Sequence, residues 1–328
     1  MPAPVPFALT TVRRGTYVPA MPLEIRSYTP ADHDVLTALI NDPAIVDQFE
    51  KIAGPTGVRD LLSEPVTHPE GVLLARLDGV PVGFSVAYVL PQSSGGFGMQ
   101  RVGVLEPHRR KGIGLALLRT SEQFLASQQK VQTLNEAGLS AWLPNDGGGA
   151  LAARAGYVHQ RYYWLMELPR TTEVVAPTWP AGVTLEVFDF SDRHHMGWVD
   201  AYNDSFAHHH LFLPSTHERG YALTKREKFR GDGLLLAFRG EACVGFCRCE
   251  LYPTRGEIGT LGTIESARGI GLGRALLHWG VDWLLANSEK PVTLLVDGEN
   301  ESALKLYHQE GFTVSRTRRI WARPLARA

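Results

Sequence analysis

Two halves of this 328-residue chain repeat the same order of sequence motifs. Residues 71–90 and 233–252 each contain two β-rich runs around a polar turn, a pattern typical of a β-hairpin. Each hairpin is followed by another β-rich run and then by a loop with a glycine pair, "RRKGIG" from Arg109 and "RGIGLG" from Arg268. The two loops are 159 residues apart (268 − 109). A repeat of this length predicts two domains built from the same elements.

The repeat sets the expected domain boundaries. Strand patterns alternate with helical patterns in each half, which predicts a mixed α/β sheet in both. We expect domains at residues 23–168 and 181–326, joined by a Pro-rich linker at 169–180. Residues 1–22 contain several prolines, and they are expected to form an extended arm.

Composition excludes several classes of partner. The chain has 33 Lys and Arg against 34 Asp and Glu, so its net charge of -1 gives no general attraction to nucleic acid or to an anionic membrane. No apolar run approaches the ~18 residues of a membrane span, and the N-terminus lacks the pattern of a signal peptide. We therefore expect a cytoplasmic protein that acts on small, nearly neutral partners.

The glycine loops have the features of a phosphate-binding site. A strand, a glycine turn and an amphipathic helix place several backbone N–H groups at a helix N-terminus, where the helix dipole is positive. Glycine lets a bulky anion approach the backbone, and neighbouring basic residues add charge. A P-loop is excluded because no Gly-Lys-Ser/Thr closes either loop. A dinucleotide fingerprint is excluded because its third glycine is replaced by Leu117 in one half and by Arg274 in the other.

Several motifs in order resemble the GNAT acyltransferase family. The two loops match its Arg/Gln-x-x-Gly-x-Gly/Ala signature, and "NESALKLYHQEGF" from Asn300 resembles its later Asn, Ala, Tyr and Gly-Phe pattern. The resemblance covers both halves and implies two tandem GNAT-like domains that use acetyl-coenzyme A. The loop would then cradle the pyrophosphate, and a splayed strand would receive the pantetheine arm.

The loop chemistry and the resemblance together predict the cofactor-binding residues. In the first half they are Val102, Gly103, Val104, Arg109, Arg110, Lys111, Gly112, Ile113 and Gly114. In the second half they are Leu261, Gly262, Thr263, Arg268, Gly269, Ile270, Gly271, Leu272, Gly273 and Asn300. Asn is also a favoured helix N-cap, so Asn300 can serve both roles.

Acetyl transfer to an amine needs a base for the amine and an acid for the leaving thiolate. Tyr307 matches the position of the family's general acid, although the same residue suits a half-buried helix face. Glu257 lies on the strand before the loop, where members of the family often carry a base. A bound water or another carboxylate could take its place.

The first half lacks both groups. Applying the repeat offset aligns Glu257 with Gly98, and the later motif aligns Tyr307 with Ala152. We therefore expect the first domain to be catalytically degenerate and the second to transfer acetyl by direct attack of a primary amine of a small molecule or peptide. The alternative is a silent acyl-CoA-binding sensor or scaffold.

Two other stretches attract attention. Residues 201–221 contain His208, His209, His210 and His217, and this region usually recognises the acceptor in the family. No ligand spacing stands out, so no metal site is predicted. Cys243, Cys247 and Cys249 alternate along a β-rich run, so they are expected to pack on one face of a buried strand.

Overall fold

The computed structural model describes residues 23–49, 56–90, 96–129, 133–173 and 175–325. The arm expected at residues 1–22 lies outside the described residues. Within them the chain divides into two compact units, one of residues 23–161 with 319–325 and one of residues 162–318.

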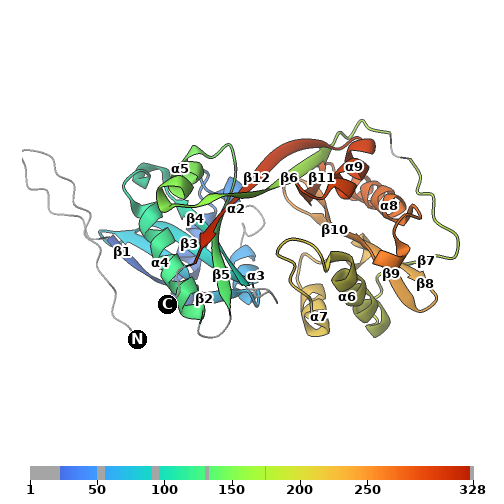
Figure 1. Ribbon diagram of the computed structural model, residues 1–328, viewed down its shortest axis with the longest axis horizontal. Helices are drawn as coiled ribbons and strands as arrows, with labels where there is room; N and C mark the ends of the chain where they lie inside the picture. Colours follow the sequence, from blue (N-terminus) through green and yellow to red (C-terminus); the bar gives the residue numbers. More distant parts are fainter. Residues whose placement is uncertain (1–22, 50–55, 91–95, 130–132, 174, 326–328) are drawn as a thin grey trace, which may run out of the picture. The chain divides into compact units, whose positions relative to one another are not determined.

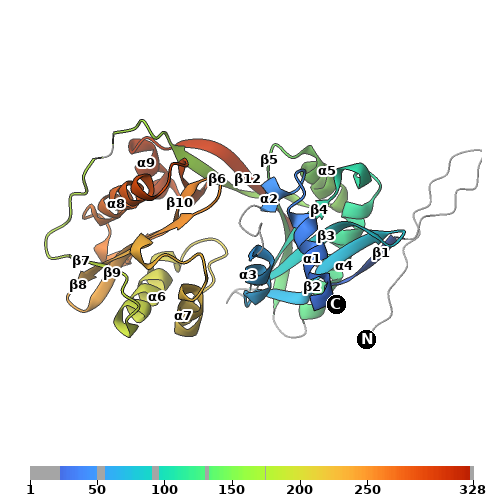
Figure 2. The same cartoon turned by 180° about the vertical axis from the view of Figure 1, so that it is seen from behind.

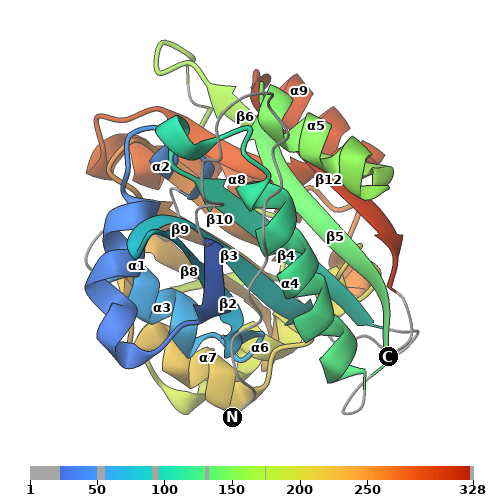
Figure 3. The ribbon, with the colours of Figure 1, turned by 90° about the vertical axis from the view of Figure 1, so that its left-hand side faces the viewer.

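The first unit is a mixed sheet with helices on both faces (Figures 2 and 3). Its strands follow the order β1-β2-β3-β4-β5, antiparallel up to β4 and parallel between β4 and β5. The strands are β1 (Leu23–Ser27), β2 (Thr67–Leu77), β3 (Val80–Leu90), β4 (Gly96–Val104) and β5 (Leu134–Leu143). The helices are α1 (His33–Ile40), α2 (Val46–Phe49), α3 (Gly57–Ser63), α4 (Ile113–Gln128) and α5 (Asp146–Ala155).

Alternation along β2 explains why both faces are covered. Leu74 packs in a core with α1 and α3, whereas Leu73 and Ala75 pack in another with α4. Successive side chains of a strand point to opposite faces, so an almost continuous apolar strand needs helices on both sides.

The second unit repeats this architecture (Figure 1). Its strand order is β7-β8-β9-β10-β11-β6, and again only one pair in the series, β10 with β11, is parallel. The strands are β7 (Thr184–Val187), β8 (Leu234–Arg239), β9 (Ala242–Leu251), β10 (Gly256–Thr263) and β11 (Val292–Asp297), and two long strands, β6 (Val158–Leu168) and β12 (Thr313–Pro324), are divided between the two units. Helices α6 (Asp192–Phe206) and α7 (His217–Thr224) lie on one face, and α8 (Leu272–Asn287) and α9 (Glu301–Gln309) on the other. The mixed sheet expected in each half is confirmed.

Each unit borrows a strand segment from the other half of the chain. Residues 162–168 of β6 belong to the second unit and pair with β11. Residues 319–325 belong to the first unit, where the Leu325 N–H donates to the Asn135 carbonyl at 2.9 Å and Trp321 joins the core beside β5. The first unit is therefore completed only when the chain's last strand is in place.

The three cysteines are free and buried, as expected, but they do not share one face. Cys247 and Cys249 pack in the core on the α8 side, whereas Cys243 packs in the core beside α6. The pairing of β8 with β9 shifts between Ala237 and Phe238, and this β-bulge turns Cys243 to the opposite face.

Candidate active site

Strands β10 and β11 separate where the site is expected. Their pairs run from Gly256 with Val292 to Ile258 with Leu294 and end there, although both strands continue. A bulge at Gly259 shifts the pairing of β10 with β9 at the same point. The β10 edge at Leu261–Thr263 therefore faces an opening with no β11 partner among the described pairs. Such an edge offers backbone groups to an extended ligand.

The glycine loop of the second unit lies at the end of β10. Gly269 and Gly271 have φ of +78° and +87°, a conformation that glycine adopts without a Cβ penalty, and Gly271 is the N-cap of α8. A Cβ at either glycine would meet no atom within 4 Å, so the loop borders open space. The first N–H groups of α8 lack helical acceptors, which suits phosphate oxygens. These residues fit the diphosphate of a coenzyme A thioester.

The loop arginines have a structural role that is the same in both units. The Arg268 guanidinium donates to the Ser205 carbonyl at the end of α6, at 3.3 Å. The Arg109 guanidinium donates to the carbonyls of Val104 and Ala44, at 3.0 and 2.8 Å. Arg268 thus ties its glycine loop to the last turn of α6, and Arg109 ties its loop to the segment that follows α1.

Tyr307 lies on α9, packs against the core of the second unit beside α8, and is only partly buried. Burial raises the pKa of Tyr307 well above its ordinary value of 10.0, and the nearby Cys247 acts in the same direction. Its hydroxyl therefore keeps its proton at neutral pH, and no side-chain hydrogen bond joins it to another described residue. Such a group is available to donate a proton to a ligand.

Asn300 is the N-cap of α9. Its Oδ1 accepts a hydrogen bond from the Ala303 N–H at 3.1 Å, which shows the capping role expected from the sequence. A contact to the cofactor stays a prediction.

Glu257 lies on β10 just before the bulge, opposite Glu250 of β9. Its side chain is 1% exposed, and the Arg255 Nε lies 2.9 Å from its Oε2. A buried carboxylate needs such a partner, because an isolated charge is costly away from water.

A second carboxylate, that of Glu250, lies beside the same bulge. A Cβ on Gly259 would come within 2.8 Å of the Glu250 carboxyl carbon. The Tyr252 hydroxyl donates to Glu250 Oε2 at 2.7 Å, and Arg248 forms an ion pair with Oε1. The sequence analysis did not single out this cluster. Its signal was the alternation in "CRCELY", which sends Arg248 and Glu250 to the face opposite Cys247 and Cys249.

The histidine-rich segment contributes to the same region. His209 is close enough to Asp297, at the end of β11, and to Arg268 for their charges to act on it. Burial is the largest effect, and it lowers the pKa of His209 below its ordinary value of 6.5, so the ring is mainly neutral at pH 7. His210 Nδ1 lies 3.2 Å from the Tyr163 hydroxyl, whereas His217 pairs with Asp200 on the exposed surface.

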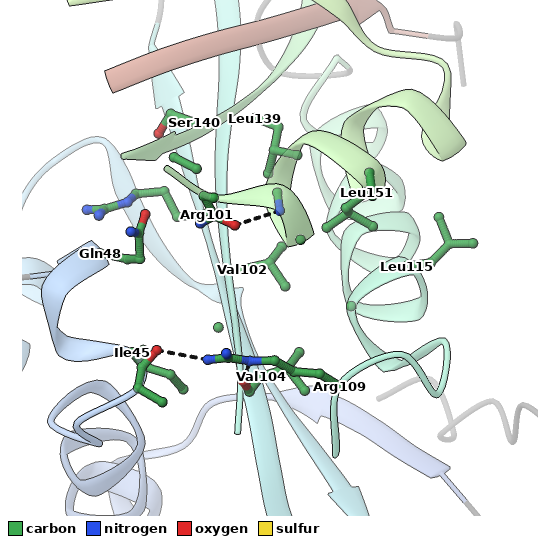
Figure 4. Close-up of a pocket in the computed structure, with 18 of the residues that line it drawn as sticks. Ile45, Gln48, Arg101, Val102, Val104, Arg109, Leu115, Leu139, Ser140 and Leu151 are labelled. Carbon is green, nitrogen blue, oxygen red and sulfur yellow. Dashed lines mark hydrogen bonds between the residues drawn. The ribbon is translucent and has the colours of Figure 1, made fainter. Parts of the chain in front are cut away.

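The first unit has the corresponding opening, which forms a pocket of about 820 Å³ (Figure 4). The pairs between β4 and β5 end at Gln100 with Leu139, so the strands separate as β10 and β11 do. The predicted residues that line the pocket are Val102, Gly103, Val104, Arg109, Arg110, Gly112 and Gly114. The Ile113 side chain is instead 1% exposed and packs in the core.

Strand register changes which residue of the first unit corresponds to Glu257. The strand β4 lacks the bulge of β10, and Met99 faces Tyr88 as Glu257 faces Glu250. Gly98 corresponds to Gly256, since a Cβ there would meet Leu125 of α4 as one on Gly256 would meet Leu284 of α8. The alignment of Glu257 with Gly98 is therefore wrong by one residue. Its conclusion holds, because Met99 is no carboxylate.

Other groups of the first unit also differ. Ala152, at the position of Tyr307, is fully buried. The Gln48 side chain accepts from the Trp142 N–H at 2.8 Å and donates to its carbonyl at 3.3 Å, so it covers the free edge of β5. The pocket thus keeps the loop but has Met99 and Ala152 at the positions of Glu257 and Tyr307.

The family follows from this fold and loop geometry. A model of the acetyltransferase (GNAT) family matches residues 43–157 and 187–312. The chain belongs to this family of acetyltransferases, which use acetyl-CoA as cosubstrate.

Individual relatives carry a more specific name. The mycothiol acetyltransferase of Thermomonospora curvata is 32% identical over 243 residues, 74% of this chain and 78% of that protein. The mycothiol acetyltransferase of Sanguibacter keddieii is 29% identical over 318 residues, 92% of this chain and 96% of that protein. The sequence motifs also indicate a two-domain layout similar to that of mycothiol synthase.

Solved structures share the fold. A GCN5-related N-acetyltransferase from Sphaerobacter thermophilus aligns with a TM-score of 0.70 at 23% identity, over 92% of this chain and 96% of that one. A tandem GNAT protein from the clavulanic acid biosynthesis pathway aligns with a TM-score of 0.65 at 17% identity, over 93% and 99%.

The described residues show neither a membrane-spanning helix nor a cluster of metal ligands. None of their helices combines the length and the apolar character needed to cross a membrane. They also contain no group of three or more His, Cys, Asp and Glu side chains arranged to hold a metal ion.

Proposed function

We propose that this acetyltransferase transfers acetyl from acetyl-CoA to a primary amine of a small molecule, and that the second unit performs the reaction by direct attack. The observation that carries the proposal is that one unit combines the open β10 edge, the glycine loop, Glu257 and Tyr307. The first unit has the opening and the loop without the two proton-transfer groups.

The cosubstrate supplies an acetyl group activated as a thioester. The N–H groups at the start of α8 and the loop Gly269–Gly273 would hold its diphosphate, with Arg268 nearby. The free edge at Leu261–Thr263 would bind its pantetheine arm, and Asn300 is a further candidate for this arm.

Glu257 would accept the proton of the attacking amine. Because amines are mainly protonated at neutral pH, a carboxylate must remove a proton before or during attack. The ion pair with Arg255 holds the carboxylate in one orientation. The adjacent Glu250 is the alternative base, either directly or through a water, because it lies against the bulge where the strands separate.

Tyr307 would donate a proton to the leaving thiolate. Its raised pKa keeps the phenol protonated over the working pH range, and its hydroxyl makes no competing side-chain bond among described residues. After release of coenzyme A the phenolate would regain its proton from solvent.

The acceptor is proposed to be a small polar amine. The relatives are named mycothiol acetyltransferases, and this name favours a small molecule over a peptide. The charged cluster of Arg248, Glu250 and Tyr252, with His209 near Asp297, would contact polar groups and a cationic amine. The amine used by mycothiol acetyltransferases is therefore the first acceptor to try.

The first unit is proposed to bind a coenzyme A thioester without turnover. Its pocket is lined by the predicted residues of the β4 edge and by Arg109, Arg110, Gly112 and Gly114 of the loop. This role limits the sensor or scaffold alternative to one half of the chain.

Steady-state kinetics tests the proposal. The amine of the mycothiol pathway, other small primary amines and a short peptide would be compared by release of free coenzyme A thiol. Turnover with a small amine that depends on both Glu257 and Tyr307 is the expected result. Turnover that survives the loss of both side chains would overturn the assignment.

A further inference from the structure

Arg101 is one of the residues that line the pocket of the first unit. It is half-buried on β4, one residue past the last pair with β5, and it lines the pocket beside Gln48 (Figure 4). Its guanidinium carbon lies 4.2 Å from the centre of the Phe49 ring. No carboxylate oxygen of a described residue lies within 4.0 Å of its nitrogen atoms.

A guanidinium in this setting is unusual. Burial is the largest effect on the pKa of Arg101 and lowers it, and Tyr88 offsets this only in part. A partly desolvated cation without a carboxylate is unfavourable until an anion joins it. The stacking on Phe49 holds the side chain in place but does not neutralise its charge.

The cation beside this position in the second unit is already paired: Arg248 donates to the Thr260 hydroxyl at 3.4 Å and forms an ion pair with Glu250. The strand registers align Arg101, opposite Val86, with Thr260, opposite Arg248. The thioester end of a ligand on the β4 edge of the first unit would therefore meet the Arg101 guanidinium. On the β10 edge of the second unit it would meet a hydroxyl beside an arginine that Glu250 already neutralises.

Arg109, Arg110 and Asp47 also line the pocket, but they do not replace Arg101. Arg109 is held by backbone carbonyls, and Arg110 belongs to the glycine loop at the phosphate end. Asp47 lines the same pocket, but it is exposed and forms no ion pair with Arg101.

We propose that the first unit's pocket binds a coenzyme A thioester whose acyl group ends in a carboxylate, and that Arg101 binds this carboxylate. The proposal rests on the proposed binding of coenzyme A by the first unit and adds the class of acyl group. The carboxylate belongs to the thioester rather than to an acceptor, because Gln48 covers the β5 edge and Met99 and Ala152 replace the second unit's Glu257 and Tyr307.

The test is titration calorimetry on the full chain carrying Gly273→Glu. The added carboxylate is expected to prevent coenzyme A binding at the glycine loop of the second unit. Gly273 has an ordinary φ, and a Cβ there would meet only Thr263 Cγ2 at 3.9 Å, so the variant is expected to fold. Succinyl-CoA, acetyl-CoA and coenzyme A with free succinate are the probes. A charge-assisted hydrogen-bonded pair predicts that succinyl-CoA binds about tenfold to a hundredfold more tightly than acetyl-CoA.

Variants locate the effect. Arg101→Met, in the same background, is expected to bring the two thioesters to similar affinity without weakening acetyl-CoA. Arg154→Met, which removes another arginine lining the pocket, is expected to retain the preference. Arg101→Gln repeats the test if the Met variant unfolds, and thermal unfolding checks each protein.

Each contrary outcome has a distinct meaning. Equal affinities in the Gly273→Glu protein, or a preference that survives in Arg101→Met, would overturn the role of Arg101 and leave the proposed coenzyme A site intact. Binding of free succinate with coenzyme A as tightly as succinyl-CoA would overturn the assignment of the carboxylate to the acyl group. If no thioester binds, both this inference and the proposed coenzyme A site of the first unit fail.

Discussion

Arg255 and Glu257, two residues apart, form a buried ion pair with 2.9 Å between Nε and Oε2, just before the point where the pairing of β10 with β11 ends and β10 bulges against β9. The pair fixes a carboxylate at the point where the free β10 edge begins. The equivalent point in the first unit carries Met99. This difference is the main structural reason for assigning the chemistry to the second unit.

Glu257→Gln is expected to lower kcat by about 10²–10⁴-fold with little change in the KM for acetyl-CoA, because it removes a base and keeps the side chain's size. Steady-state kinetics with an accepted amine measures this. Met99→Leu in the first unit is the matched control and should leave kcat unchanged. Full activity in Glu257→Gln together with loss in Glu250→Gln would transfer the base role to Glu250.

Tyr307→Phe is expected to lower kcat by about 10²–10⁴-fold while the fold is retained, since the ring still packs 6.0 Å from Phe312. Tyr157→Phe, at the position of Phe312 in the first unit, is a hydroxyl-deletion control. It removes bonds to Gln100 and Glu122 and should lower stability but not kcat. An unchanged kcat in Tyr307→Phe would rule out the general-acid role.

Asp32 is expected to stabilise the first unit in a pH-dependent way. Hydrogen bonds from Arg26 are the main cause that holds the pKa of Asp32 well below its ordinary value of 3.8. The stabilisation is therefore fully present above about pH 4 and is lost as the pH falls toward the depressed pKa of the folded state.

Asp32→Asn should thus lower the free energy of unfolding by about 2–3 kcal/mol at pH 7, somewhat less than for a fully buried pair because Arg26 is 32% exposed. Denaturant unfolding at pH 7 and at pH 3 should show a smaller difference from wild type at the lower pH. Asp34→Asn, at an exposed site on α1, is the control. A difference that does not change with pH would contradict the assigned cause.

The C-terminal strand should be needed by the first unit. Trp321 is 5% exposed in the core that contains Leu134 and Ala137, so Trp321→Ala is expected to cost about 3–5 kcal/mol. Hydrogen exchange at β5 measures the loss in that unit alone. Val314→Ala, at an exposed position of the same strand, should have almost no effect. Equal rates of hydrogen exchange at β5 in the two variants would argue against the contribution of residues 319–325 to the first unit.

Local patterns carried most of what the sequence could predict. Hairpins, glycine loops and helix caps depend on residues that are close in the sequence. The repeat shows the same order of these elements in both halves of the chain. The strand exchange at residues 319–325 depends on which distant edge a strand joins, and no local pattern encodes that choice. The bulge at Gly259 likewise shifts the alignment of Glu257 by one residue, because register is a property of the strand pair.

The site shows the same division. The glycine loop and Asn300 could be recognised as sequence motifs. Arg101 and Glu250 could be identified as candidate site residues only from the structure, because the strands place them beside an opening. Gln48 and Trp142 are 94 residues apart, and their hydrogen bonds could not be read from either segment.

The central claim is that the second unit performs the acetyl transfer, and a matched pair of loop variants tests it most directly. Gly114→Glu and Gly273→Glu place a carboxylate at equivalent positions of the two loops, where an added Cβ would meet no atom closer than 3.8 and 3.9 Å. Acetyl-CoA-dependent acetylation of the accepted amine should be abolished in Gly273→Glu and retained in Gly114→Glu. Retention in Gly273→Glu with loss in Gly114→Glu would place the chemistry in the first unit and contradict the account.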